Sequence, residues 1–352
     1  MLTVIICIQA LCTGIISSEQ TKEPLFPVFV KGKHGYIDAK GRIRITPQFD
    51  DAGSFAEERA AVKIKGKWGY IDRGGEIVIR PRFDLASPSL SRIGVGELGD
   101  SPFSDDMAAV ALKGKWGYIN RSGQTVIRFD FDIASPFSGG FARVKVGDKY
   151  GYINKSGDYS ISLKYDGALD FSEGMAAVMR NGKYGYVDSK GSLVIPEQFD
   201  RAADFTSGLA LVSQRQKDGH LKQTFIDKIG KLVFTSTYAK AYSFSEGLAE
   251  VQTTGGMRGY IDRDGVLVID TKYERTTEFS EGLAAVCVQV GKDSYKWGYI
   301  DREGQYTIRP TLDFASPFEN GLARIDVDNV FTSSRRRYYI DKNGATVQIL
   351  HR

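Results

Sequence analysis

Several residue types that proteins use for chemistry are scarce in this sequence of 352 residues. Only three histidines are present, His34, His220 and His351, and they lie far apart along the chain. The sequence also lacks paired cysteines and His-x-Glu spacings, the usual sources of zinc ligands. We therefore expect no metal site and no bound cofactor, and we expect the three histidines to lie at the surface.

Cysteine is equally scarce. Cys7 and Cys12 lie in an apolar leader, so Cys287 is the single cysteine of the remaining chain and cannot form an internal disulfide there. Cys287 follows Val286 at the end of an expected strand and has no histidine near it in sequence. This context favours a buried structural thiol over a catalytic nucleophile.

The chain also lacks a large excess of one charge and a long apolar run. Its 47 basic and 43 acidic residues give a formal net charge of +4, which provides no strong signal for nucleic-acid binding. The apolar run over 2–16 is short for a membrane span and resembles a secretory signal, although no Lys or Arg precedes it. We expect a leader over 1–18, a linker over 19–25 and export to the periplasm, cell envelope or medium. A misassigned start codon, leaving the protein in the cytoplasm, is the alternative.

One aromatic position recurs and sets the period of the remaining chain. It is filled by Tyr36, Tyr70, Tyr118, Tyr152, Tyr186, Phe225, Tyr260, Tyr299 and Tyr339. The shortest spacing is 34 residues, and longer spacings indicate insertions in the same unit. A phenylalanine follows each of the first eight members, and an alanine lies five residues beyond that phenylalanine. The sequence therefore predicts nine units over 26–350, with one inserted loop at 89–102.

Each unit has the pattern of three short strands. Residues 60–64 alternate apolar and polar side chains, and the following Gly66-Lys67 pair is typical of a hairpin turn. A second strand is expected over 67–72, followed by a turn in which an acidic residue and a glycine recur. Pro81 is expected to end the third strand. We predict an all-β chain of three-stranded antiparallel meanders, with the recurring acids acting as turn formers rather than catalytic carboxylates.

Four positions of the unit are expected to form the core: the phenylalanine, the alanine, the Val62-like position and the Ile71-like position. Nine units of three short strands, with no terminal strand to complete the first unit, favour an open, twisted, solenoid-like array. A closed ring like a β-propeller is the alternative, although propeller blades usually need four strands.

The runs Lys67–Asp72, Lys115–Asn120 and Lys296–Asp301 resemble the bacterial WG repeat, also called the KWG repeat. The Phe-Asp-x-Ala connector and the Ser-Glu-Gly-Leu-Ala step at 280–284 extend this resemblance over roughly the whole repeat region. The resemblance implies the repeat unit. It implies no general activity, cofactor or catalytic residue.

Two sets of residues are candidates for binding. The first is an aromatic position that we expect to be half exposed, although packing between units also explains it; its members are Trp68, Trp116, Tyr150, Tyr184 and Trp297. The second is three lengthened hairpins, 213–222, 287–296 and 326–336, expected to project from one edge of the array. Their candidate side chains are Arg215, His220, Tyr295, Arg335 and Arg336, with Arg337 just beyond. Neutral drift in loop length is the alternative.

Repetition without a catalytic constellation favours a non-catalytic binding scaffold for a protein or an envelope glycan. An envelope hydrolase is the first alternative, with its site in loop 89–102 near Asp100, Asp105 and Asp106. A purely structural spacer is the second.

Overall fold

The computed structural model describes residues 23–86, 102–329 and 334–347. Within these residues the regular structure is β-strand throughout, and the strands form nine antiparallel sheets. A search of the described residues for a helix able to cross a membrane finds none.

We call the sheets blades 1 to 9 in chain order. Blades 1 to 3 contain β1 (Leu25–Val30), β2 (Lys33–Asp38), β3 (Ile43–Phe49); β4 (Asp51–Ala52), β5 (Ala60–Ile64), β6 (Lys67–Ile71), β7 (Ile77–Phe83); and β8 (Met107–Leu112), β9 (Lys115–Asn120), β10 (Thr125–Phe131). Blades 4 to 6 contain β11 (Ile133–Ala134), β12 (Ala142–Val146), β13 (Lys149–Ile153), β14 (Tyr159–Tyr165); β15 (Gly167–Ala168), β16 (Met175–Arg180), β17 (Lys183–Asp188), β18 (Leu193–Phe199); and β19 (Arg201–Ala202), β20 (Ala210–Arg215), β21 (Leu221–Ile226), β22 (Leu232–Thr235). Blades 7 to 9 contain β23 (Lys240–Ser245), β24 (Leu248–Gln252), β25 (Arg258–Ile261), β26 (Leu267–Tyr273); β27 (Arg275–Thr276), β28 (Ala284–Gly291), β29 (Ser294–Ile300), β30 (Tyr306–Leu312); and β31 (Phe318–Glu319), β32 (Leu322–Asn329), β33 (Ser334–Asp341), β34 (Thr346–Val347).

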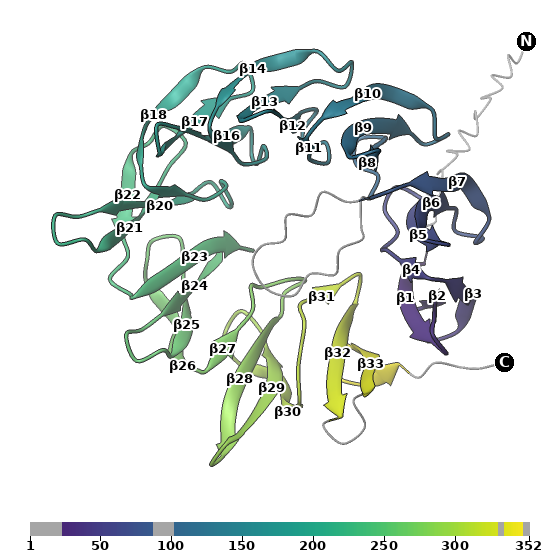
Figure 1. Ribbon diagram of the computed structural model, residues 1–352. Coiled ribbons are helices and arrows are strands. Elements are labelled where there is room, and N and C mark those ends of the chain that lie inside the picture. The colour runs from purple at the N-terminus through teal and green to yellow at the C-terminus, as the bar shows by residue number, and fades with distance from the viewer. Residues whose placement is uncertain (1–22, 87–101, 330–333, 348–352) are drawn as a thin grey trace, which may run out of the picture.

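The blades form a closed ring, a nine-bladed β-propeller, in which β1 and β33 lie side by side (Figure 1). The expectation of an open array is therefore wrong, and the alternative that we gave is the observed fold. The first and last blades meet through side chains: Phe26, Val28 and Ile37 of blade 1 pack with Leu322, Tyr339 and Val347 of blade 9. Closure thus needs no terminal strand that completes the first blade.

The predicted three-stranded unit is also incomplete. In most blades the connector contributes a fourth strand, usually of two residues, which lies nearest the centre of the ring in Figure 1. The third strand does not stop at Pro81, because Phe83 pairs with Trp68 across an irregularity in the ladder. Pro81 lies within this bulge, where its missing N–H removes no ladder hydrogen bond.

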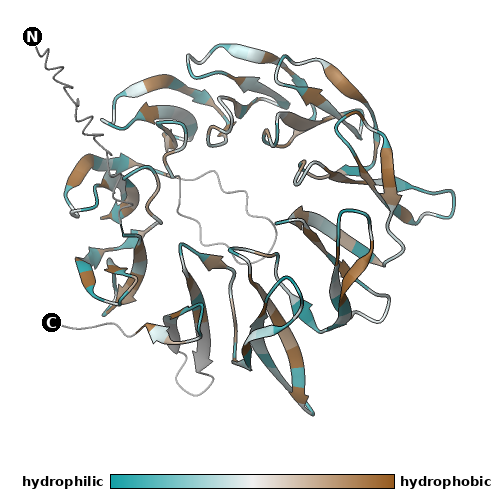
Figure 2. Ribbon diagram, turned by 180° about the vertical axis from the view of Figure 1, so that it is seen from behind, coloured by the Kyte–Doolittle hydropathy of each residue, from teal (hydrophilic) through white to brown (hydrophobic). Residues whose placement is uncertain are grey.

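Each blade buries both of its faces. Ile71 of β6 packs with Tyr36 and Ile45 of blade 1, whereas Trp68 and Tyr70 of the same strand pack with blade 3. Figure 2 shows hydrophobic segments distributed among the blades around the ring. The predicted core positions are confirmed as buried, apart from the half-buried Phe55. The tyrosine position is buried as well, although it was not assigned to the core.

In most blades a buried tyrosine connects the blade to the connector that follows. The hydroxyl of Tyr36 donates to the backbone carbonyl of Gly53, 17 residues later, at 2.7 Å. The same contact recurs from Tyr118, Tyr152, Tyr186, Tyr260 and Tyr299 to residues 135, 169, 203, 277 and 316. Tyr339 makes it across the closing interface, to the carbonyl of Pro27 at 2.8 Å. One contact therefore orients successive blades and also closes the ring.

A second connection links three segments at the surface. The ammonium group of Lys115 donates to Asp132, whose other carboxylate oxygen accepts the backbone N–H of Gly147 in the next hairpin at 2.8 Å. Equivalent Lys–Asp pairs, of 2.5 to 2.7 Å, involve Lys33, Lys67, Lys149, Lys183 and Lys296. Each of these lysines therefore pairs with an aspartate 17 residues later in the chain.

Candidate functional site

The sequence-predicted tryptophans are buried, with 3% of Trp68 and 8% of Trp116 and Trp297 exposed. Tyr150 and Tyr184 are half-buried. This position therefore contributes chiefly to packing between blades and does not present an edge of exposed rings. Stacking of these rings on sugars or on partner side chains would require their faces to be open.

The lengthened hairpins are present as extensions of β20–β21, β28–β29 and β32–β33, and the first two extend beyond the rim in Figure 1. Arg215, His220 and Tyr295 are exposed on them, with 48% of the Tyr295 side chain accessible. The side chains of Arg335, Arg336 and Arg337 lie outside the described residues. Of the candidates with described side chains, Arg215 and His220 lie on the hairpin of blade 6 and Tyr295 lies on that of blade 8.

The loop 89–102, proposed above for an enzyme site, lies almost entirely outside the described residues, as does Asp100. Asp105 accepts the backbone N–H of Gly140 in the next blade at 2.9 Å, and Asp106 pairs with Arg121 at 2.9 Å. Asp105 thus connects blades 3 and 4, whereas the Asp106 pair lies within blade 3. The recurring turn acids behave as predicted: Asp72 Oδ1 accepts the backbone N–H groups of Gly74 and Glu76, at 2.9 and 3.0 Å.

Cys287 is buried beside Trp297 in the core of blades 8 and 9, as predicted for a structural thiol. Its burial raises the pKa of the thiol, which keeps it protonated at neutral pH. Among the described residues no group of three or more His, Cys, Asp or Glu side chains is arranged to hold a metal ion.

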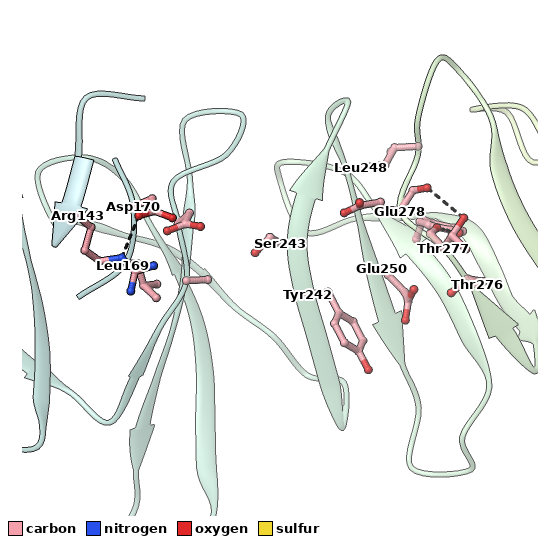
Figure 3. A pocket seen from close by; sticks show the side chains of 13 residues that line it. Arg143, Leu169, Asp170, Tyr242, Ser243, Leu248, Glu250, Thr276, Thr277 and Glu278 are labelled. Atoms are coloured by element: carbon pink, nitrogen blue, oxygen red, sulfur yellow. Dashed lines mark hydrogen bonds and ion pairs between the residues drawn. The ribbon is translucent and has the colours of Figure 1, made fainter. Parts of the chain in front are cut away.

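A cleft of about 620 Å³ lies on the inner side of blades 4 to 8. Its lining follows the short inner strands and the turns after them, and Figure 3 shows side chains from both walls. We call it the inner cleft; it is lined by Arg143, Leu169, Asp170, Ala203, Asp204, Tyr242, Ser243, Leu248, Glu250, Tyr260, Thr276, Thr277 and Glu278.

The cleft lies where the repeat changes. Phe225 of blade 6 occupies the tyrosine position and has no hydroxyl, so this interface lacks the contact that Tyr186 makes with Ala203. The residue that would supply the carbonyl, 17 positions later, is Tyr242. There β23 is six residues long and its ladder is irregular between Ala241 and Phe244. Tyr242 and Ser243, which lie in this irregularity, form part of the cleft wall.

Acidic side chains gather at one repeat position around the cleft. The residue before the anchor phenylalanine is serine or proline in blades 2, 3, 4, 7 and 9, but Asp170, Asp204 and Glu278 occupy it in blades 5, 6 and 8. Asp170 accepts from the Arg143 guanidinium at 2.9 Å (Figure 3). A comparison of units at this one position could have identified these residues, but the sequence analysis examined only the positions that repeat.

Glu250 is the fourth carboxyl group, at a position filled by alanine in four of the nine units. It is 8% exposed and accepts from the Arg258 guanidinium at 2.6 Å. Burial raises its pKa, although the neighbouring Thr276 hydroxyl and Arg258 oppose that shift. Arg258 also lies over the Tyr242 ring, 5.8 Å from the ring centroid, so Tyr242, Arg258 and Glu250 form one connected wall.

Comparison with known proteins identifies the repeat. The family described as WG containing repeat matches residues 35–68, 68–89, 116–150, 150–184, 184–217, 224–256, 259–289 and 297–331. No curated protein sequence matches the chain.

Solved structures resemble the chain at low identity. BamB from Moraxella catarrhalis is 10% identical, with 74% of this chain and 90% of that chain covered and a TM-score of 0.44. The dihydro-heme d1 dehydrogenase NirN in complex with DHE is 11% identical, with coverages of 83% and 72% and a TM-score of 0.48. The WD40 domain of SCAP from fission yeast is 8% identical, with coverages of 68% and 83% and a TM-score of 0.38. The family matches, which cover far more than half of the chain, show that this protein belongs to the WG containing repeat family.

Proposed function

We propose that this chain is a non-catalytic binding scaffold whose ring presents the inner cleft to a partner. The observation that carries the proposal is the place of the cleft: it lies where blades 5 to 8 depart from the residues repeated elsewhere. A cavity of 620 Å³ with a few converging polar groups has the size and character of a small-ligand or side-chain site. The other interfaces fold with serine, proline or alanine at the same positions, so folding alone does not require these acids.

The test compares wild type with the double variant Asp204→Asn, Glu278→Gln as bait in extracts of the source organism. We expect wild type to retain a protein or glycan that the double variant loses. Glu303→Gln is the matched control, because Glu303 is an exposed acid in a turn of blade 8 and does not line the cleft. Identical capture by wild type and the cleft variant would refute the role of the cleft, and the absence of any capture would refute the scaffold.

The exposed hairpins provide a second candidate surface. Val290 and Tyr295 expose 54% and 48% of their side chains at the end of the β28–β29 hairpin. Trimming the three hairpins to the length of the β5–β6 turn should leave the ring folded. If this surface binds the partner, the trimmed variant loses capture while the cleft variant keeps it.

We further propose that the protein is exported, on the basis of the apolar, uncharged run over 2–16. The test is the N-terminal sequence and cell fraction of the protein produced from its full gene. A mature N-terminus near Ser18 in the envelope or medium would support export. An intact N-terminus in the cytoplasm would contradict it.

A further inference from the structure

Blade 1 differs from the other blades at the position nearest the centre of the ring. In the four-stranded blades a segment of the preceding connector pairs with the first long strand, as β4 pairs with β5, and in blade 3 Leu85 forms the equivalent bridge to Ala111. Among the described residues blade 1 contains only β1, β2 and β3, so β1 is its inner edge (Figure 1). We call the place beside this edge the open position. A strand edge offers backbone N–H and C=O groups to another segment.

The backbone groups that face the open position are those of Phe29. In blade 3 the C=O of Ala111 accepts the N–H of Asp84, and its N–H donates to the C=O of Leu85, both at 2.9 Å. Phe29 and Ala111 are equivalent, because each pairs with the residue two positions before the repeat tyrosine. The side chain of Phe29 is 54% exposed. Its backbone is thus directed toward the place that a connector fills in blade 3.

The hydroxyl contact at the closing interface gives independent evidence of the open position. In blade 2 the C=O of Gly53 accepts from the Tyr36 hydroxyl at 2.7 Å, and the N–H of Gly53 donates to the C=O of Ala61 at 2.9 Å. The Tyr339 hydroxyl instead donates directly to the C=O of Pro27, which has the position of Ala61 in blade 1. Two hollows of about 200 and 40 Å³ share Pro27 and Tyr339 in their linings. Among the described residues, no connector therefore separates strand and tyrosine here, and space adjoins their contact.

The connectors of blades 2 to 6 share the sequence Asp-x-Ala, whose aspartate holds the hairpin that follows. A carboxylate oxygen of Asp50 accepts the backbone N–H of Lys65 at 2.7 Å. Equivalent contacts, of 2.7 to 2.8 Å, are made by Asp84, Asp132, Asp166 and Asp200.

The hairpin of blade 1 has the same backbone but no such aspartate. Lys31 is the residue equivalent to Lys65, and both are left-handed, with φ of +50° and +49°. Among the described residues, no aspartate lies at the corresponding place beside β1. The N–H of Lys31 and its exposed, positively charged side chain therefore complement a carboxylate group.

The chain's own residues before β1 do not match the connector sequence. The repeat spacing that places Asp50 and Ala52 before β5 places Ile16 and Ser18 before β1. The Phe26 ring, which lies 5.4 Å from the Tyr339 ring, already takes the anchor position. A segment added here would therefore end soon after its alanine. The open position fits a short extended segment of another polypeptide.

We propose that the inner edge of β1 binds an extended segment of a partner polypeptide with the sequence Asp-x-Ala, an inference that goes beyond the inner cleft and adds a second binding site to the ring. The segment pairs antiparallel with β1 and completes blade 1 as β4 completes blade 2. Its backbone exchanges two hydrogen bonds with Phe29, and its carboxylate accepts the N–H of Lys31. The alanine is required because the equivalent Ala134 is fully buried in the core of blades 3 and 4.

Calorimetric titration of the full chain with a defined peptide tests the sequence preference. The probe is acetyl-Gly-Asp-Ile-Ala-Ser-Gly-amide, which carries residues 132–135 of this chain between two glycines. The matched control peptide has asparagine in place of aspartate. We expect the aspartate peptide to bind, and the asparagine peptide to bind about tenfold more weakly because it loses a charge-assisted hydrogen bond. Absence of binding, or equal binding of the two peptides, would overturn the proposal.

Substitutions at Phe29 locate the binding. Phe29→Pro removes the N–H that donates to the segment, whereas Phe29→Val keeps the N–H and removes the ring. Proline is tolerated at a strand edge, and Pro27 already lies on this edge of β1. We expect the aspartate peptide to bind Phe29→Pro about tenfold more weakly than Phe29→Val, with similar unfolding midpoints. Equal affinities would place the peptide elsewhere on the ring and overturn the proposal. If Phe29→Pro does not fold, the comparison of the two peptides on wild type decides.

Hydrogen exchange distinguishes other occupants of the open position. Without peptide the amide of Phe29 should exchange rapidly, and saturating peptide should slow its exchange. Slow exchange without peptide would show that the chain's own residues fill the position, or a second copy if protection increases with protein concentration. Either result would overturn the proposal. The inner-cleft proposal would be unaffected, because neither Phe29 nor Lys31 lines that cleft.

Discussion

Single hydroxyl groups hold this ring together at the residue scale. The hydroxyl of Tyr118 is buried and donates to the carbonyl of Ser135 at 2.7 Å, and burial raises the pKa of that phenol far above its ordinary value. The phenol therefore stays protonated and available as a donor over the whole physiological pH range. Phe225 shows that the fold tolerates one interface without this group, and a cleft lies at that interface.

We expect Tyr118→Phe to destabilise the protein by about 1–2 kcal/mol, because the buried carbonyl of Ser135 loses its donor. Urea unfolding, followed by tryptophan fluorescence, would measure this loss of stability. Tyr159→Phe is the matched control, because Tyr159 is 48% exposed. Removal of its hydroxyl group should change stability by less than about 0.5 kcal/mol. Equal effects of the two substitutions would contradict the role given to the hydroxyl.

The sequence predicted the hydrophobic positions well, because burial repeats with the period of the chain. It gave no indication of the tyrosine hydroxyl contact, whose acceptor is a backbone carbonyl 17 residues away, and carbonyls look alike in every sequence. The cleft was not predicted because its residues differ from the repeat instead of following it. Asp170, Asp204 and Glu278 are departures from a repeat, and their proximity depends on the curvature of the ring.

At the element scale, the glycine that precedes seven of the eight repeat tyrosines allows the third strand to bulge against the second. A Cβ at Gly69 would lie 2.4 Å from the carbonyl oxygen of Ile79, and other glycines of this position show the same clash with the third strand. Thr224 replaces the glycine in blade 6, where the ladder continues directly from Thr224–Thr235 to Phe225–Phe234 without a shift. Glycine therefore marks a close approach of two backbones.

We expect Gly69→Ala to lose about 3 kcal/mol or more, because backbone atoms cannot move aside as a side chain can. Gly66→Ala is the comparison. Gly66 has a φ of +80° but open space around its Cβ position, so only left-handed strain of about 1–2 kcal/mol is expected. The denaturant midpoints of both variants would measure these losses of stability. A larger loss of stability in Gly66→Ala than in Gly69→Ala would contradict the bulge explanation.

The Lys–Asp–hairpin connections predict a dependence on acid. The Lys115 ammonium group lowers the pKa of Asp132, and the N–H of Gly147 adds to that effect. A carboxyl group with a lowered folded-state pKa contributes stability above its unfolded pKa of about 4, and that contribution is lost as pH falls through the folded value. Lys33, Lys67, Lys149 and Lys183 have the same effect on their aspartates, so the losses coincide.

We therefore expect Lys115→Met to lower the Tm at pH 7. The difference from wild type should shrink as pH falls below about 4 and disappear once Asp132 is protonated in the folded protein. High salt should also reduce this difference, because both groups are partly exposed. Lys155→Met, at an exposed turn position, is the control and should change neither value. A difference that persists at a pH low enough to protonate Asp132 in the folded protein would show that packing, not charge, is responsible.

At the scale of the whole molecule, the ring closes between blades 9 and 1. These two neighbouring blades are not joined by a connector and meet through side chains. Sequence reasoning favoured an open array because it looked for a strand to complete the first blade. The decisive information was the position of Phe26, whose ring lies 5.4 Å from that of Tyr339 and replaces the anchor phenylalanine of the other interfaces. Such a contact joins residues more than 300 positions apart, so no local pattern could reveal it.

This interface should be the weakest, because every other pair of blades is also held by a covalent connector. After partial opening, a connector keeps two blades at high effective concentration, whereas blades 9 and 1 have only their contacts. The double variant Phe26→Ala, Tyr339→Phe should therefore open the ring and increase the radius of gyration measured by small-angle scattering. The same deletions at an internal interface, Phe55→Ala with Tyr36→Phe, remove a comparable ring pair and hydroxyl contact. That control should lower the unfolding midpoint while the radius of gyration stays that of the closed ring. If both double variants kept the wild-type radius, closure would depend on the remaining packing of Val28, Ile37 and Leu322, and the role assigned to Phe26 and Tyr339 would be wrong.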